Sequence, residues 1–177
     1  MKNLLTIASV AFMLLVTFSC STQNNIPSAN IARLLESNQF TFMAERANPM
    51  DADVIKAMNS LPGGGGSRIL NLDSGYTIEI RKEKLSVTLP YFGRMYNANM
   101  DDSKNSYRFT TTDFTVDKKQ GKKGSSIYTI VAKDQQNMRT IYMEVFKNGK
   151  TYVSIDSNDR QSISYNGYIM ENTMLKK

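Results

Sequence analysis

Short segments in which apolar and polar residues alternate, separated by turn residues, make up most of the chain after residue 68. In Tyr76–Arg81 every second residue is apolar, which is typical of a β-strand with one buried face. Ile127–Ala132 and Ile141–Phe146 are apolar on both faces and are predicted to lie centrally in a sheet. Roughly nine strands joined by tight turns predict a mainly β fold, a single antiparallel meander that forms a β-barrel or half-barrel. A β-sandwich is the alternative.

The turns between these strands have recognisable sequences. Asn148-Gly149 is the strongest hairpin signal, because both residues tolerate the positive φ of a type I′ turn. Lys118–Gly124 forms a basic hairpin tip with two interpretations. Its lysines either contact anionic lipid headgroups or keep the turn solvated and the strand edges unattractive to partners.

The segment before the strands is predicted to contain one or two short helices. Ser28 is a candidate cap for the first helix, in which Ile31, Leu34 and Leu35 share a face, and a first strand covers Phe40–Ala47 up to Asn48-Pro49. A second helix follows Asp51 or Asp53 and is expected to cover a sheet face or a barrel end. The glycine run that follows lacks the Gly-Lys-Ser/Thr of a phosphate loop, so it is interpreted as a flexible connector leading to a strand at Ile69–Leu72.

The N-terminus has the pattern of an export signal. Lys2 precedes a mostly apolar run that is too short to span a bilayer comfortably, and Ser19 and Cys20 follow that run. Cys20 is the only cysteine of the chain, and its position predicts lipidation after cleavage. We therefore expect a lipoprotein signal peptide over residues 1–19, a tether over 20–27 and a single β domain over 28–177. An ordinary secretory signal is the alternative.

The most specific stretch is LSVTLPYFGRMY, residues 85–96. Leu85 begins a strand, Pro90 ends its ladder, and Gly93 allows a bend. Arginine beside aromatic residues is a typical anion-binding arrangement, so this end of the strand and the later Asn158–Tyr165 turn are interpreted as a candidate ligand site. The candidate ligand-binding residues are Tyr91, Phe92, Arg94, Tyr96, Arg160 and Tyr165. The alternative is that the two arginines pair with a carboxylate such as Glu45 or Asp156 and fix a barrel end.

The composition excludes several kinds of chemistry. The chain has no histidine, so the commonest general base and metal ligand is missing, and the one cysteine is assigned to the signal boundary. Two acidic pairs, Asp101 with Asp102 and Asp156 with Asp159, lie beside turn residues and are better explained as solvated turns. The sequence therefore predicts no catalytic residue, no metal site, no cofactor and no enzyme. The net charge of +6 is spread over many loops rather than gathered in a stripe, which argues against nucleic-acid binding.

Four pieces of the chain, in order, resemble one protein family: FTFMAERANP, LPYFGRMY, FKNGK and SNDRQSISYNG. The resemblance is to a family of bacterial envelope lipoproteins known only as domain of unknown function 4251, and it covers about Phe40 to Ile169. It implies an exported or lipid-anchored protein of a Gram-negative envelope with a lipocalin-like β-barrel and no assigned catalytic residues. The chain has no tryptophan, and so it lacks the one that true lipocalins have near the first strand.

Together these features predict an uncharacterised, non-catalytic module held in the cell envelope by an N-terminal lipid and facing the periplasm. Its barrel interior or mouth is expected to bind a small amphiphilic ligand. The alternative is a structural or protein-interaction module whose barrel is packed solid and whose outer surface meets an envelope protein. A barrel of this size either fills itself with side chains or holds one ligand, so strand number does not decide between them.

Overall fold

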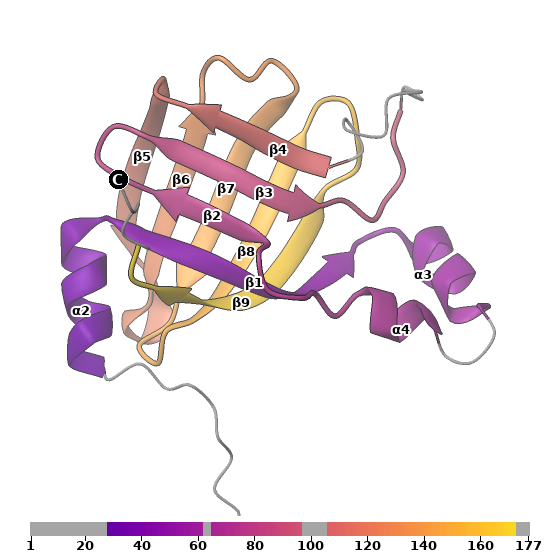
Figure 1. Cartoon of the computed structure of the whole chain (residues 1–177), viewed down its shortest axis with the longest axis horizontal. Helices are drawn as coiled ribbons and strands as arrows, with labels where there is room; N and C mark the ends of the chain where they lie inside the picture. Colours follow the sequence, from indigo (N-terminus) through magenta and orange to yellow (C-terminus); the bar gives the residue numbers. More distant parts are fainter. Residues whose placement is uncertain (1–27, 62–64, 97–105, 173–177) are drawn as a thin grey trace, which may run out of the picture.

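The computed structural model describes residues 28–61, 65–96 and 106–172. Its strands form one antiparallel sheet in the order β4-β3-β2-β1-β9-β8-β7-β6-β5, which curls into a nearly closed barrel (Figure 1). The strands are β1 (Phe40–Pro49), β2 (Thr77–Ile80), β3 (Leu85–Pro90), β4 (Ser106–Thr111), β5 (Phe114–Gln120), β6 (Ser126–Ala132), β7 (Met138–Val145), β8 (Lys150–Ser157) and β9 (Ile163–Met170). Strands that are consecutive in sequence pair with each other, except that β4 and β5 form the two edges of the sheet, and β1 also pairs with β9. The predicted antiparallel meander is confirmed.

Helix α2 (Ser28–Ser37) lies at one end of the barrel (Figure 1). Its residues Ile31 and Leu34 are buried and Leu35 is partly buried, as their shared helical face predicts. Asn38 has a φ of +52° and ends the helix in the left-handed conformation that asparagine tolerates. The Leu35 carbonyl accepts hydrogen bonds from Tyr128 Oη at 3.2 Å and from Lys118 Nζ, which connects the helix to β5 and β6.

The inside of the barrel is packed with side chains. Phe40, Phe42, Tyr128 and Tyr165 each have 0 % of their surface exposed. Phe40 meets the Tyr128 ring edge to face, with centroids 5.3 Å apart. Inward residues alternate with exposed or half-buried ones along most strands, so period-two patterning places the core inside the curled sheet. The barrel interior is therefore filled by its own side chains.

The segment between β1 and β2 differs from the prediction in two ways. Residues 65–69 form helix α4 (Gly65–Ile69), so the predicted strand at Ile69–Leu72 is wrong; only Asn71 forms a bridge, to Arg46. A Cβ on Gly66 would lie 2.1 Å from the Met58 carbonyl oxygen, so this glycine allows α4 to contact α3 (Ala52–Asn59) closely. Gly65 and Gly66 are thus helical, and residues 62–64 lie outside the described ranges.

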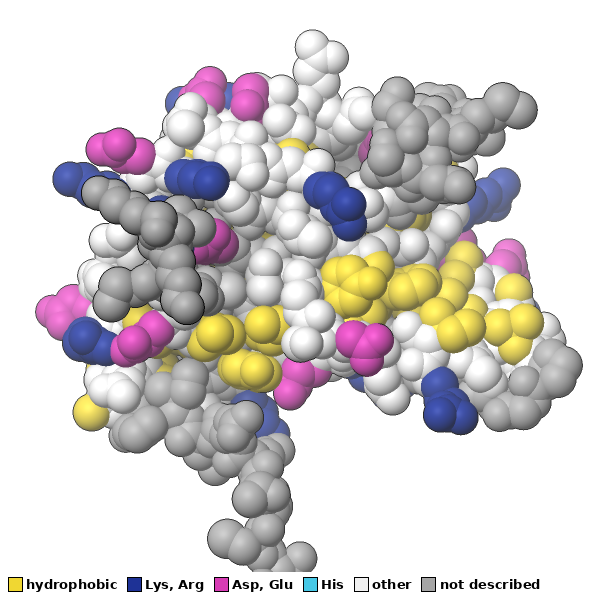
Figure 2. All heavy atoms as spheres, viewed as in Figure 1, with side chains coloured by type: hydrophobic (Ala, Val, Ile, Leu, Met, Phe, Trp, Pro, Cys, Tyr) yellow, Lys and Arg dark blue, Asp and Glu magenta, His cyan; other side chains and the backbone are white. Residues whose placement is uncertain are grey.

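Helices α3 and α4 pack on each other beyond the barrel (Figure 1). No residue of α3 is buried, so the helix does not cover a sheet face as expected. Its start is fixed by Asp51, whose carboxylate accepts hydrogen bonds from the backbone N–H groups of Asp53 and Val54. Hydrophobic side chains gather on the surface at these helices (Figure 2). The exposed ones are Met50, Ile55, Leu61 and Ile69.

One turn and one strand end also differ in detail from the sequence prediction. At the β7–β8 turn only Gly149 has a positive φ, of +79°, and its N–H donates to the Phe146 carbonyl. This is the three-residue hairpin with a left-handed glycine rather than the predicted type I′ turn. β1 ends at Pro49, which is still paired, opposite Ile163, so the strand extends two residues beyond the predicted Phe40–Ala47.

Candidate binding site at the barrel mouth

The stretch after β3 forms a strap across one end of the barrel. It runs antiparallel to the β8–β9 turn: Met95 forms a bridge with Arg160, and Tyr96 N–H donates to the Asp159 carbonyl at 2.8 Å. The Gln161 N–H donates to the Arg94 carbonyl at 3.0 Å. The two most specific pieces of the sequence, LPYFGRMY and SNDRQSISYNG, are therefore joined by backbone hydrogen bonds.

Tyr91 holds the bend of this strap. Its hydroxyl lies 2.9 Å from the Arg94 carbonyl oxygen and 3.0 Å from that of Gln161, and its single proton is shared between these two acceptors. A Cβ on Gly93 would lie 2.4 Å from the Tyr91 hydroxyl oxygen, so glycine is needed for the tyrosine side chain to fold back over the bend.

Arg160 lies at the centre of the cluster behind the strap. Its Cζ is 5.0 Å from the ring centroids of both Tyr91 and Tyr107, and these two rings meet edge to face at 5.8 Å. Asp159 binds the guanidinium through both carboxylate oxygens, at 3.1 Å from Nε and 2.8 Å from Nη2. Both side chains are largely buried, so this bidentate pair is held in place by two rings and a salt bridge.

The tyrosines of the cluster remain neutral at physiological pH. Burial raises the pKa of Tyr91 and of Tyr107 to about 12, and burial raises the pKa of Tyr165 well above its ordinary value. Tyr165 donates a hydrogen bond to the Pro90 carbonyl at 2.7 Å, and the Tyr107 hydroxyl lies 3.1 Å from that of Ser157. Burial by itself lowers the pKa of Arg160, but the hydrogen bond and charge of Asp159 raise it above its ordinary value. The site therefore holds a permanent cation, its counterion and neutral phenols.

An open pocket of about 680 Å³ lies beside this cluster, between β4, the β6–β7 loop and the β8–β9 turn. We call it the mouth pocket. Its lining combines thioether and aromatic groups with amides and hydroxyls. The lining residues are Met95, Ser106, Tyr107, Arg108, Phe109, Asp134, Gln135, Gln136, Asn137, Met138, Ser157, Asp159 and Arg160.

The structure brings together only part of the predicted site. Tyr91, Arg160 and Tyr165 meet in the cluster, and Phe92 is half-buried against the core. Arg94 and Tyr96 are exposed on the strap, Tyr96 with 61 % of its surface. Sequence reasoning missed Tyr107, which reaches the cluster because β3–β4 register sets it opposite Leu89. Tyr107 and Phe109 alternate with polar residues, a pattern that is typical of a strand but gives no sign of this contact.

Of the two acidic pairs in the sequence, the structure describes Asp156 and Asp159. Asp156 accepts a hydrogen bond from Ser162 and lies 3.8 Å from Arg139, whereas Asp159 binds Arg160, so the two carboxylates serve different partners. Asp101 and Asp102 lie outside the described residues. In the described ranges, no group of three or more acidic, cysteine or histidine side chains could hold a metal ion.

A comparison with the profiles of known protein families identifies the family of this chain. The profile of one family, described as Domain of unknown function (DUF4251), matches residues 23–169, which is most of the chain. The chain belongs to the DUF4251 family. No curated protein matches this DUF4251 member significantly. Among the described residues of this DUF4251 chain, none of the helices is long and apolar enough to cross a membrane.

Raising the pH should destabilise this DUF4251 domain through its buried tyrosines. The neutral phenol is favoured in the folded state because burial raises the pKa of Tyr91 and Tyr107 from an ordinary value near 10 to about 12. The stability they contribute is fully present below pH 10 and is lost as the pH rises from about 10 through 12. Urea unfolding across this range should show a falling midpoint, and Tyr107→Phe should show a shallower fall. Parallel curves for the two proteins would contradict this assignment.

Proposed function

We propose that this protein is a non-catalytic binding module of the cell envelope, anchored by a lipid on Cys20 and facing the periplasm, which takes a small amphiphilic ligand in the mouth pocket. The observation that carries the proposal is the mouth pocket itself, about 680 Å³ at a barrel end whose interior is filled. That volume is within the range of small-molecule sites. Export and anchoring are supported by the signal-like residues before Cys20 and by the fact that Cys20 is the only cysteine of the chain.

The chemistry of the lining indicates the kind of ligand. Met95, Phe109 and Met138 offer apolar, adaptable contacts for a hydrocarbon portion. The lining contains equal numbers of arginines, Arg108 and Arg160, and of aspartates, Asp134 and Asp159. The Nε–Nη2 edge of Arg160 is already occupied by Asp159. The pocket thus favours a neutral or zwitterionic polar group over the simple anion that arginine beside aromatics suggested.

Native mass spectrometry of residues 21–177, produced with export in a Gram-negative host, tests the binding function. All described elements lie within residues 28–172, so this chain keeps every one of them. A discrete added mass that disappears on solvent extraction supports a carrier and identifies its cargo. Gln136→Trp, which puts an indole at the exposed rim of the pocket, should reduce the bound fraction at least about tenfold by steric exclusion.

Gln120→Trp is the matched control. Gln120 is exposed at the far end of β5, away from the mouth pocket, so this variant should keep the wild-type bound fraction. A bound mass that is unaffected by Gln136→Trp would place the ligand elsewhere and contradict the mouth site. Labelling of the full chain with radioactive palmitate, compared with Cys20→Ala, separately tests the anchor; unlabelled wild-type protein would contradict it.

A second function is favoured by a different observation. The fully buried aromatic interior fits a solid-packed barrel, and the exposed Met50, Ile55, Leu61 and Ile69 on and beside α3 and α4 fit contact with an envelope protein. A clean apo mass from a protein that melts cooperatively would support this interaction role. In that case Ile55→Glu should abolish cross-links to a partner in the envelope without lowering the melting temperature.

A further inference from the structure

The barrel end opposite the mouth pocket gathers four exposed lysines. Lys122 and Lys123 lie in the short helix η3 (Lys122–Gly124) between β5 and β6, and Lys147 and Lys150 flank the β7–β8 turn. The two turns touch each other, because a Cβ on Gly124 would lie 2.3 Å from Lys147 Cε. We call these four residues the basic end. Lysines from two separate hairpins thus form one surface.

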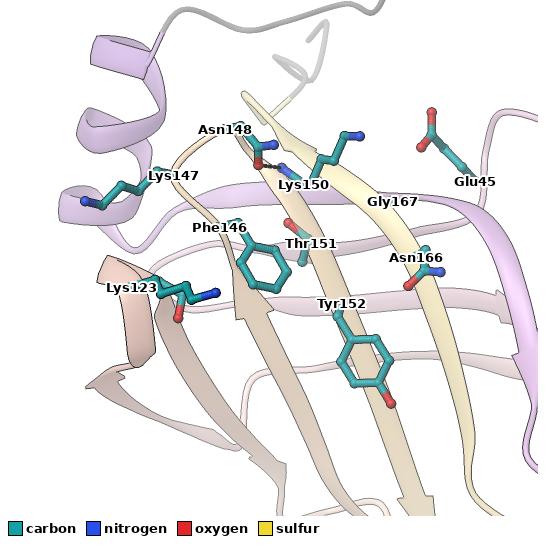
Figure 3. Close-up of a pocket in the computed structure, with 11 residues that line it drawn as sticks. Glu45, Lys123, Phe146, Lys147, Asn148, Lys150, Thr151, Tyr152, Asn166 and Gly167 are labelled. Atoms are coloured by element: carbon teal, nitrogen blue, oxygen red, sulfur yellow. Dashed lines mark hydrogen bonds between the residues drawn. The ribbon is translucent and has the colours of Figure 1, made fainter.

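The basic end has an excess of positive charge. Within residues 28–61, 65–96 and 106–172, none of its lysines forms an ion pair within 4.0 Å of a carboxylate. A surface hollow of about 710 Å³ adjoins Lys123, Lys147 and Lys150, and Glu45 is its one acidic lining residue (Figure 3). Glu144 is nearby and accepts a hydrogen bond from Ser125 at 2.7 Å. The four lysines therefore outnumber the acidic groups next to them.

An exposed aromatic residue lies among these lysines. Phe146 retains 42 % of its surface exposed and lines the same hollow as Tyr152 (Figure 3). Outward placement follows from the strand pattern, since the neighbouring Val145 and Thr151 are buried on the other face. Aromatic side chains flanked by lysines suit the headgroup region of a bilayer, where the ring enters the interface and the ammonium groups meet phosphate.

The described chain begins at this same end. Helix α2 starts at Ser28, and Ile31 in its first turn touches the β7–β8 turn, because a Cβ on Gly149 would lie 3.0 Å from Ile31 Cδ1 (Figure 1). Seven residues, 21–27, separate Ser28 from Cys20. Fully extended, they span about 25 Å, so a lipid on Cys20 keeps this end near the bilayer surface. A tether of that length gives the lysines a high effective concentration of headgroups.

We propose that the basic end docks on anionic phospholipid headgroups, with Lys122, Lys123, Lys147 and Lys150 contacting phosphates and Phe146 entering the interface. This inference rests on the anchoring at Cys20 proposed above. Docking by this end orients the barrel so that the mouth pocket, at the other end, faces away from the membrane. The lipid then supplies attachment, and the lysines supply orientation.

The test uses residues 21–177 without a lipid, so it does not depend on whether Cys20 is acylated. Sedimentation with phosphatidylcholine vesicles containing about one third phosphatidylglycerol should show binding that falls with added salt, and pure phosphatidylcholine should bind far less. The Lys147→Gln/Lys150→Gln variant should bind about 30-fold more weakly, since each lysine near an anionic surface contributes about fivefold. Phe146→Ser should weaken the residual salt-resistant binding.

Lys56→Gln/Lys133→Gln is the control, because it removes the same charge from an exposed residue of α3 and from exposed Lys133, which directly follows β6 at the opposite end of the barrel. It should bind nearly as well as the wild type. Equal losses in the two double variants would mean attraction by net charge alone and would overturn the proposal. Equal binding to the two kinds of vesicle would also overturn it. Palmitate labelling reports separately on Cys20, so a failed anchor and a failed docking surface are distinguishable.

Discussion

Replacing Arg160 with methionine is expected to lower the free energy of unfolding by about 3–5 kcal/mol, because the Asp159 carboxylate would remain buried without its counterion. Only 7 % of the Arg160 side chain and 15 % of the Asp159 side chain are exposed. The substitution also removes the cation that lies 5.0 Å from two tyrosine rings. Urea denaturation of the wild type and the variant at neutral pH measures this loss. The dependence of unfolding free energy on urea concentration, the m-value, should be compared between the two proteins.

Arg94→Ala is the matched control for that experiment. Arg94 is exposed, and its contribution to the strap comes from its carbonyl, which accepts hydrogen bonds from Tyr91 and from the Gln161 N–H. Alanine keeps this carbonyl, so the change in stability should stay within about 0.5 kcal/mol. The double variant Arg160→Met/Asp159→Leu should lose less than Arg160→Met alone. A mild Arg160→Met variant, or a severely destabilised Arg94→Ala, would contradict this account of the cluster.

The different burial of the two arginines shows where sequence reasoning stopped. Both follow aromatic or polar turn residues, so both were equal candidates for a ligand site or an ion pair. The expected carboxylate partners were Glu45 and Asp156, yet Arg160 binds its own neighbour Asp159. An ion pair between adjacent residues depends on how the β8–β9 turn bends, and spacing in the sequence does not report that bend.

The strands were predictable because their signal is local. In β3, Leu85, Val87 and Leu89 are buried while Ser86 and Thr88 are not, as the alternation indicates. The face that is buried and the partner strand follow from register, which involves residues far apart in the chain. Tyr107 joined the site in this way, through the pairing of β4 with β3. Gly66 is similar, because its role is a contact with Met58 that a run of glycines does not reveal.

Gly167→Ala is expected to cost about 3 kcal/mol of unfolding free energy, because a Cβ at this position meets rigid backbone. The Cβ would lie 1.9 Å from the Met43 carbonyl oxygen and 2.8 Å from the Phe42 ring. Gly167 pairs with Ala44 in β1, next to the bulge between Ala44 and Arg46, so neither strand can retreat without breaking the β1–β9 ladder. Urea denaturation should show a lower midpoint. The final glycine of SISYNG is thus explained by close packing of two strands.

Gly65→Ala provides the comparison for this prediction. Gly65 is helical and has no atom within 4 Å of a Cβ position, so alanine should be neutral or should stabilise the protein by up to about 1 kcal/mol. The two substitutions add the same methyl group, and only its surroundings differ. If both variants unfolded at the wild-type midpoint, the β1–β9 contact would have to be looser than the structure has it. If both were equally destabilised, glycine flexibility rather than strand packing would explain the effect.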